Sequence, residues 1–153
     1  MGLLMTYKAL KNETFEDSFK TMQNGKAEEN WADYLEILGS EQDVLDIDKS
    51  WNLLGIIFEN CEVGNFIWGK SDNMFELEEV TICMFSKKYL EFVIDFIKKE
   101  NLLDKNIFIN YCKLNNEFSE TTDSDYYFEK FEKIINFYLN AIKNKNWVMG
   151  ELM

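Results

Sequence analysis

The sequence predicts an α+β fold, in which a small sheet, mostly antiparallel or mixed, packs against several amphipathic helices. Two observations lead to this prediction: several segments repeat apolar residues at intervals of three and four, and short aliphatic or alternating segments lie between them. Of the 153 residues, 46% are hydrophobic and 16% aromatic, so the chain has ample material for a packed core. No linker or repeat divides it, and we expect a single compact domain over residues 1–153.

Four segments are expected to form or contain strands. Residues 2–10 are rich in aliphatic side chains and end at a polar break, and residues 44–48 alternate apolar and acidic side chains. Strand-like sequence also lies within 75–85, and the apolar run at 147–149 is expected to be a closing strand. Residues 59–73 contain two glycines and several polar residues, which is typical of a loop.

The first half of the chain is expected to contain three helices. One begins at a Thr14 cap and ends near Asn24, and a second covers residues 27–38, with apolar side chains aligned on one face of each. A third is expected to begin at an Asp48 cap and to carry Trp51 on its inner face.

The second half is expected to contain three more helices. Ser86 is placed to cap a helix that runs through residue 100, and a helical piece at 106–114 precedes the longest helix, at about 123–145. This longest helix should form the principal helical wall of the core, because large apolar residues repeat along it at intervals of three and four. These residues are Phe128, Phe131, Ile135, Tyr138 and Ile142.

The formal net charge is −12, from 28 acidic and 16 basic residues, and every basic residue is lysine. A protein that binds nucleic acid is expected to present a basic face and usually arginine. The composition therefore argues against nucleic acid as a partner. It is compatible with a basic protein partner, or with an acidic surface that serves solubility alone.

The three cysteines, Cys61, Cys83 and Cys112, are odd in number and widely spaced, so we expect reduced thiols rather than disulfides. The first residues lack the pattern of a signal peptide, and no stretch approaches the roughly 18 uncharged residues of a membrane span. We therefore expect a cytoplasmic protein that does not associate with membranes. The sequence does not indicate its oligomeric state.

The sequence contains no histidine, which removes the usual general base, the Ser-His and Cys-His nucleophile systems and most zinc sites. Residues 64–70 contain two glycines and a lysine but lack the pattern and spacing of a phosphate-binding loop. The acidic clusters at 46–48 and 123–125 lack the central glycine and the twelfth ligand of a calcium loop. We predict no metal site and no cofactor.

The most concentrated set of polar and aromatic groups is Asp46, Asp48, Lys49, Trp51 and Asn52. If Asp46 and Asp48 lie in an extended segment, they project to one face and could pair with Lys49 or bind a polar ligand. The structural alternative is a solvated strand end, with Asp48 capping the next helix and Trp51 buried.

This segment also takes part in a family resemblance. Segments 1–4, 45–51, 66–69 and 85–88 occur in an order that resembles the YfbM-like bacterial family, domain of unknown function 1877, over nearly the whole chain. The most specific motif is the Asp-Lys-Ser-Trp sequence at 48–51. The resemblance implies a compact α+β domain of bacterial origin and no established activity.

The chain departs from the family pattern at two positions. A histidine commonly follows the tryptophan where this chain has Asn52, and a second glycine is common where it has Lys70. If the family possessed histidine-dependent chemistry, this chain would lack it.

Three functions are compatible with these features. We favour a non-enzymatic binding or protein-interaction domain, in which the acidic surface and the region of Trp51 and Trp68 make the contact. A specific form of it is an immunity or antitoxin-like protein that neutralises a basic toxin. The third is a hydrolase or transferase that works through Asp46, Asp48 and Lys49, since catalysis by carboxylates alone is known.

Overall fold

The computed structural model describes residues 3–11, 20, 44–69, 74–76, 80–115 and 118–153. The helices expected from Thr14 to Asn24 and over 27–38 fall outside this description. The elements in the described part are β1 (Met5–Lys11), β2 (Val44–Asp48), α3 (Ser50–Phe58), β3 (Met74–Glu76), β4 (Thr81–Phe85), α4 (Lys87–Lys99), α5 (Lys105–Leu114), α6 (Ser124–Lys143) and β5 (Asn146–Leu152).

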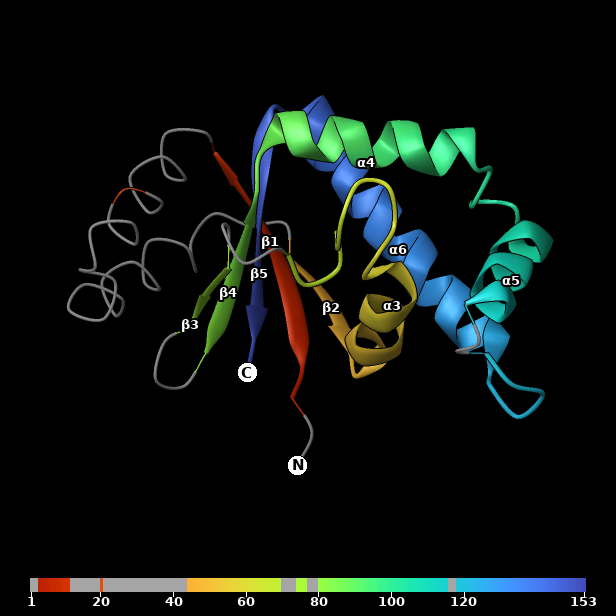
Figure 1. The fold of residues 1–153 in the computed structure, drawn as a ribbon. Helices are drawn as coiled ribbons and strands as arrows, with labels where there is room; N and C mark the ends of the chain where they lie inside the picture. Colours follow the sequence, from red (N-terminus) through yellow and green to blue (C-terminus); the bar gives the residue numbers. More distant parts are fainter. Residues whose placement is uncertain (1–2, 12–19, 21–43, 70–73, 77–79, 116–117) are drawn as a thin grey trace.

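The strands form one antiparallel sheet in the order β2-β1-β5-β4-β3 (Figure 1). The central strand is β5, and its pairing with β1 stays in register from Met5 opposite Leu152 to Lys11 opposite Asn146. The strand-like sequence at 75–85 supplies parts of two neighbouring strands, β3 and β4. An antiparallel sheet with separate helices confirms the α+β fold.

The described helices gather on one face of the sheet (Figure 1). Two of them begin as expected, because a side-chain oxygen satisfies a free backbone N–H in the first turn. Ser86 accepts from the Tyr89 N–H at 3.1 Å to cap α4, and Asp123 accepts from the Tyr126 N–H at 3.1 Å to cap α6. Asp104 caps α5 in the same way, which the sequence analysis did not predict.

The start of α3 differs from the prediction. Its N-terminal cap is Lys49, and no side chain makes a capping hydrogen bond there. Asp48 lies one residue earlier with φ 55°, a left-handed conformation that aspartate tolerates better than most residues. The expectation that Asp48 caps this helix is therefore wrong, because the chain uses Asp48 to turn out of β2. Trp51, in the first turn of α3, is half-buried.

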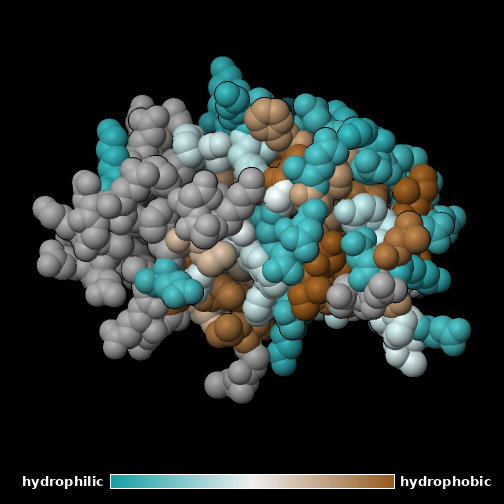
Figure 2. Space-filling view, viewed as in Figure 1, coloured by the Kyte–Doolittle hydropathy of each residue, from teal (hydrophilic) through white to brown (hydrophobic). Residues whose placement is uncertain are grey.

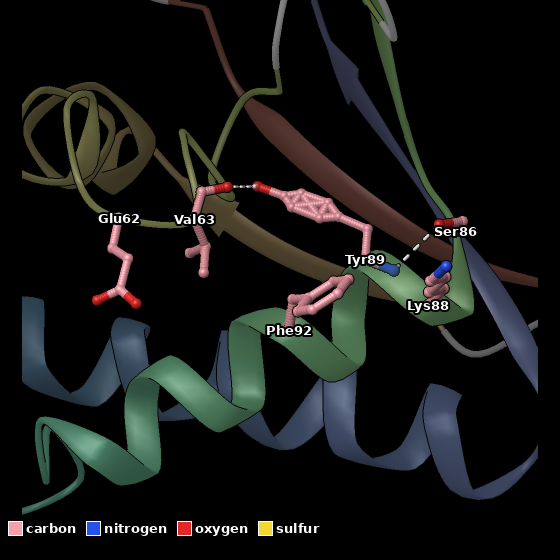
Figure 3. Close-up of a pocket in the computed structure, with 6 residues that line it drawn as sticks. All are labelled: Glu62, Val63, Ser86, Lys88, Tyr89 and Phe92. Carbon is pink, nitrogen blue, oxygen red and sulfur yellow. Dashed lines mark hydrogen bonds between the residues drawn. The ribbon is translucent and has the colours of Figure 1, made fainter.

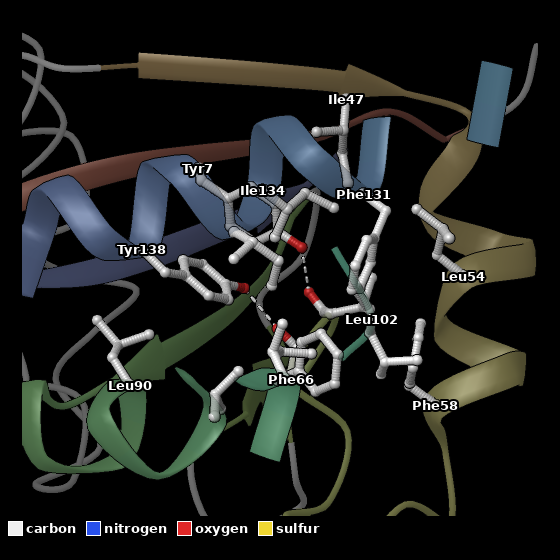
Figure 4. Close-up of a cluster of buried hydrophobic side chains, with 14 of the residues drawn as sticks. Tyr7, Ile47, Leu54, Phe58, Phe66, Leu90, Leu102, Phe131, Ile134 and Tyr138 are labelled. Atoms are coloured by element: carbon white, nitrogen blue, oxygen red, sulfur yellow. Dashed lines mark hydrogen bonds between the residues drawn. The ribbon is translucent and has the colours of Figure 1, made fainter. Parts of the chain in front are cut away.

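Aromatic rings from three helices, α3, α5 and α6, meet in the core, and Figure 4 shows the part of this cluster around Phe131. The Phe131 ring stacks on Phe108 at 4.6 Å and on Phe58 at 5.4 Å between ring centroids. Along α6 the buried residues are Phe131, Ile134, Ile135, Tyr138 and Ala141. The predicted stripe is thus confirmed at its centre, whereas its two ends, Phe128 and Ile142, are half-buried.

On the face shown in Figure 2, hydrophilic residues cover much of the coloured surface, and an apolar area lies over α5. Leu103, Ile107 and Leu114 are exposed in this region. None of the described helices combines the length and the apolar character needed to cross a membrane.

Because tyrosine and cysteine side chains are buried, the free energy of unfolding changes with pH in the alkaline range. Burial raises the pKa of Tyr7 and Tyr138 well above 10.0, and it raises the pKa of the Cys83 thiol from 9.0 to about 12. The folded protein keeps these protons where the unfolded chain loses them, so stability is complete below about pH 9 and falls as pH rises toward 12.

We therefore expect the midpoint of urea unfolding to decrease from about pH 9 upward, and tyrosinate absorbance to develop together with unfolding. For Cys83 alone, the free energy of unfolding is expected to decrease by on the order of 1 kcal/mol per pH unit between about pH 9 and about pH 12. Tyrosinate absorbance that develops fully while the protein remains folded would contradict this assignment.

Candidate functional site

Two of the residues selected from the sequence, Trp51 and Trp68, lie together in the structure. Trp51 belongs to α3, and Trp68 belongs to the segment of turns that follows this helix. Their ring centroids are 5.5 Å apart in an edge contact with an interplanar angle of 61°. The indole N–H of Trp51 donates to the backbone carbonyl of Leu3 at 2.9 Å, which holds the ring at the start of β1.

The two indoles line a cavity of about 200 Å³. It lies at the end of the sheet where β1 begins and β5 ends. The C label of Figure 1 stands at this end of β5. We call it the tryptophan pocket, and its lining residues are Met5, Trp51, Trp68, Met74, Glu76, Thr81, Cys83 and Leu152. The sheet therefore supplies most of the lining, and α3 with its following segment supplies the aromatic part.

Two glycines allow the close approaches that shape this pocket. A Cβ atom on Gly55 of α3 would lie 2.4 Å from the six-membered ring of Trp68, so the ring rests directly on the helix backbone. A Cβ atom on Gly150 of β5 would lie 2.5 Å from both the Cys83 sulfur and the Met5 methyl group. Gly150 thus leaves the space that these two lining side chains occupy.

The buried amide of Asn65 fixes the segment that carries Trp68. Its Nδ2 donates to the Gly55 carbonyl at 3.2 Å, while its Oδ1 accepts from the backbone N–H groups of Ile67 at 3.0 Å and Trp68 at 3.2 Å. A single side chain therefore ties Trp68 to the helix on which its ring rests.

Two buried tyrosines hold the same segment from the core side (Figure 4). The Tyr7 hydroxyl donates to the Ile67 carbonyl and the Tyr138 hydroxyl donates to the Phe66 carbonyl, each at 2.5 Å. Because both tyrosines are fully buried, these bonds satisfy carbonyls that water does not reach. The backbone before Trp68 is thus fixed on both sides.

The chemistry of the tryptophan pocket is apolar with one negative charge. Glu76 is an exposed residue of the lining, and Thr81 adds a hydroxyl group. The Cys83 thiol is 2% exposed, and its raised pKa of about 12 keeps it protonated at neutral pH. Of the lining residues in the described part of the chain, only Glu76 is therefore charged.

The acidic residues selected from the sequence lie apart from this pocket. Asp46 and Asp48 are at the end of β2 and do not line it. Asp46 Oδ1 accepts from the Asp48 N–H at 2.7 Å, and Asp48 Oδ2 accepts from the Tyr126 hydroxyl at 3.3 Å and lies 4.0 Å from Lys130 Nζ. These contacts turn the chain and attach β2 to α6.

The neighbouring residues Lys49 and Asn52 are both exposed and do not line the tryptophan pocket. The Lys49 backbone N–H donates to Asp48 Oδ1 at 2.9 Å. The six selected residues thus divide into the tryptophan pair, the polar turn formed by Asp46, Asp48 and Lys49, and Asn52 on the exposed side of α3.

A second cavity, of about 470 Å³, lies between the turn after α3 and the outward face of α4 (Figure 3). The Tyr89 hydroxyl donates to the Val63 carbonyl at 3.1 Å, and Phe92 stands beside it with 57% of its surface exposed. Glu62 and Lys88 add opposite charges to the lining, but Glu62 is paired with Lys99 at 2.8 Å. The aromatic rings of this cavity are those of Tyr89 and Phe92, whereas the tryptophan pocket is lined by two indoles.

No three residues of the types His, Cys, Asp and Glu come close enough to hold a metal ion within the ranges that the structure covers. Neither cavity therefore contains a metal-binding cluster formed by described residues.

Comparisons with known proteins identify the fold. The family profile described as "Domain of unknown function (DUF1877)" matches residues 1–150. The solved structure of YfbM from Escherichia coli, titled a protein of unknown function, is similar with a TM-score of 0.65 and 18% sequence identity, over 98% of this chain and 99% of that one. No curated protein matches the sequence.

Proposed function

The chain belongs to the DUF1877 family, whose description names no activity, and from its geometry we propose that it is a non-enzymatic binding protein for a basic protein partner. The tryptophan pocket receives one side chain of that partner. The observation that carries this proposal is the pair of fixed indoles, Trp51 and Trp68, which line a small open cavity at the end of the sheet.

The fixed indoles suit binding because folding already orders their side chains, so little further conformational entropy is lost when a partner binds. Trp68 rests on Gly55 and is held by Asn65, and Trp51 is bonded to Leu3. Tryptophan is enriched among the few residues that contribute most of the free energy of protein association. A rigid aromatic wall loses little conformational entropy when a partner docks against it.

The size of the pocket supports one side chain as its occupant. Sites for drug-sized ligands have volumes of roughly 300 to 1,000 Å³. The tryptophan pocket, at about 200 Å³, is below this range. The net charge of −12 favours a basic partner, since long-range attraction accelerates its association.

The lining groups support binding rather than catalysis. The sequence contains no histidine, Glu76 is the one charged group among the described lining residues, and Cys83 is protonated. A nucleophile with a neighbouring base, or two facing carboxylates, is the usual minimum for the hydrolase alternative. Asp46 and Asp48 do not line the cavity and instead bond to the chain around them.

The test uses dye-labelled peptides of sequence Gly-Arg-Gly-X-Gly-Arg-Gly, in which X is alanine, norleucine or lysine, and measures binding by fluorescence anisotropy. We expect a peptide with a long side chain at X to bind about tenfold more tightly than the alanine peptide, because truncating an anchor side chain costs more than about 1 kcal/mol. The Trp68→Ala variant should lose this preference. Affinity should also decrease between low and physiological ionic strength.

Phe92→Ala is the matched control, because it removes an exposed aromatic ring from the second cavity and should leave the preference unchanged. Circular dichroism melting checks that each variant is folded, and Trp51→Phe and Trp68→Phe provide milder changes to the same wall. A wild-type protein that binds all three peptides equally, or a folded Trp68 variant that keeps the preference, would refute the proposed function.

A further inference from the structure

We propose that the side chain received by the tryptophan pocket is that of lysine, whose ammonium group is held between the indoles and the Glu76 carboxylate. This inference rests on the proposed function and names the chemical class that the pocket selects. It is carried by the combination of aromatic walls and a single negative charge around one small cavity.

The first argument is the complementarity of the lining to an alkylammonium group. The methylene chain of lysine fits an apolar lining such as Met5, Met74 and Leu152, and its ammonium group requires a carboxylate or an aromatic face at the far end. Tryptophan is the side chain that attracts cations most strongly through its ring face. Trp51 and Trp68 provide these rings beside the same cavity.

The second argument is the sign of the charge. Glu76 is the only charged group among the lining residues that the structure places, and the cavity has no described lysine in its lining to neutralise it. In the sequence around β3, residues 70–79 contain four acidic residues and one lysine. The described lining therefore repels an anionic ligand, whereas a cation gains from the net negative charge of the chain.

The third argument separates lysine from arginine. The guanidinium group is planar and is recognised best by two parallel hydrogen bonds to one carboxylate. Here Glu76 supplies the one carboxylate of the described lining, and the rest of this lining is apolar or a single hydroxyl, that of Thr81. The compact ammonium group of lysine suits this arrangement better than the guanidinium group of arginine. Most of the five guanidinium N–H donors would have no acceptor here.

The test compares the lysine and norleucine peptides described above and adds a peptide with arginine at X. We expect the lysine peptide to bind about tenfold more tightly than the norleucine peptide, since a partly desolvated cation over a tryptophan face contributes about 1 to 2 kcal/mol. It should also bind more tightly than the arginine peptide, because most guanidinium N–H groups would lack acceptors in this lining. Glu76→Gln should reduce the preference for lysine over norleucine several-fold. The norleucine affinity itself should change little.

Glu120→Gln is the matched control, because Glu120 is also exposed, lies outside the pocket and loses the same charge. It should keep the full preference for lysine. Equal binding of lysine and norleucine that still depends on Trp68 would overturn the lysine assignment and leave the proposed function standing. Tighter binding of arginine, or an unchanged lysine preference in Glu76→Gln, would also overturn it, and no dependence on X would overturn both proposals.

Discussion

Replacing Phe131 with alanine is expected to lower the free energy of unfolding by about 3 to 5 kcal/mol, the range for emptying a buried phenylalanine site. Phe131 is 0% exposed and stacks between Phe58 and Phe108, so its removal leaves a cavity bordered by rings from two other helices. Such rings relax poorly into the space, because each is held by further contacts of its own. Urea or thermal unfolding followed by circular dichroism measures the loss.

Asn136→Ala on the same helix is the control for Phe131→Ala. Asn136 is exposed, and substitutions at such positions are usually within about 0.5 kcal/mol of neutral. If Phe131→Ala were as mild as this control, α6 would not be the principal wall of the core.

The second large effect is expected for the double variant Tyr7→Phe, Tyr138→Phe. Each substitution removes a buried hydroxyl and leaves a buried carbonyl, that of Ile67 or Phe66, without its donor. An unsatisfied buried polar group costs about 1 to 3 kcal/mol, so the double variant should lose about 2 to 6 kcal/mol. The rings themselves remain, and the loss therefore reports the hydrogen bonds rather than packing.

Tyr127→Phe is the control, because no hydrogen bond joins its hydroxyl to any residue in the described part of the chain. It should change stability by less than about 0.5 kcal/mol. In the double variant, the segment before Trp68 should exchange its amide hydrogens faster, since two of its attachments are gone. If the double variant had the same free energy of unfolding and the same amide exchange rates as the wild type, Asn65 alone would fix the segment before Trp68.

The helices in the second half of the chain could be predicted from the sequence because their signals are local. Ser86 and Asp123 stand directly before the apolar repeats that they begin, and a cap depends only on residues within one helical turn. The start of α3 could not be predicted in this way. Asp48 has the chemistry of a cap, but its left-handed backbone was not visible in the sequence pattern.

The candidate site was predicted only in its aromatic part. Trp51 and Trp68 were noticed because tryptophans beside a polar cluster are conspicuous in a sequence. Glu76, Thr81 and Cys83 were missed, since they enter the pocket through strands whose order in the sheet brings distant parts of the chain together. Only the order of the strands, which leaves no periodic signal in any one segment, could have identified them.

The polar turn at the end of β2 has a consequence for association between copies of the chain. Among the strands that the structure describes, β2 is the outermost on its side of the sheet, and an outermost strand can template pairing with another molecule. The Asp48 N–H already donates to Asp46, and the register of the β1–β2 pair shifts between Met5 and Thr6. If the β2 strand of a second copy docked here, the aspartates of the two copies would repel each other. The two aspartates thus make this edge a poor template for intermolecular sheet growth, and their replacement by alternating valine and threonine would create an aggregation-prone strand.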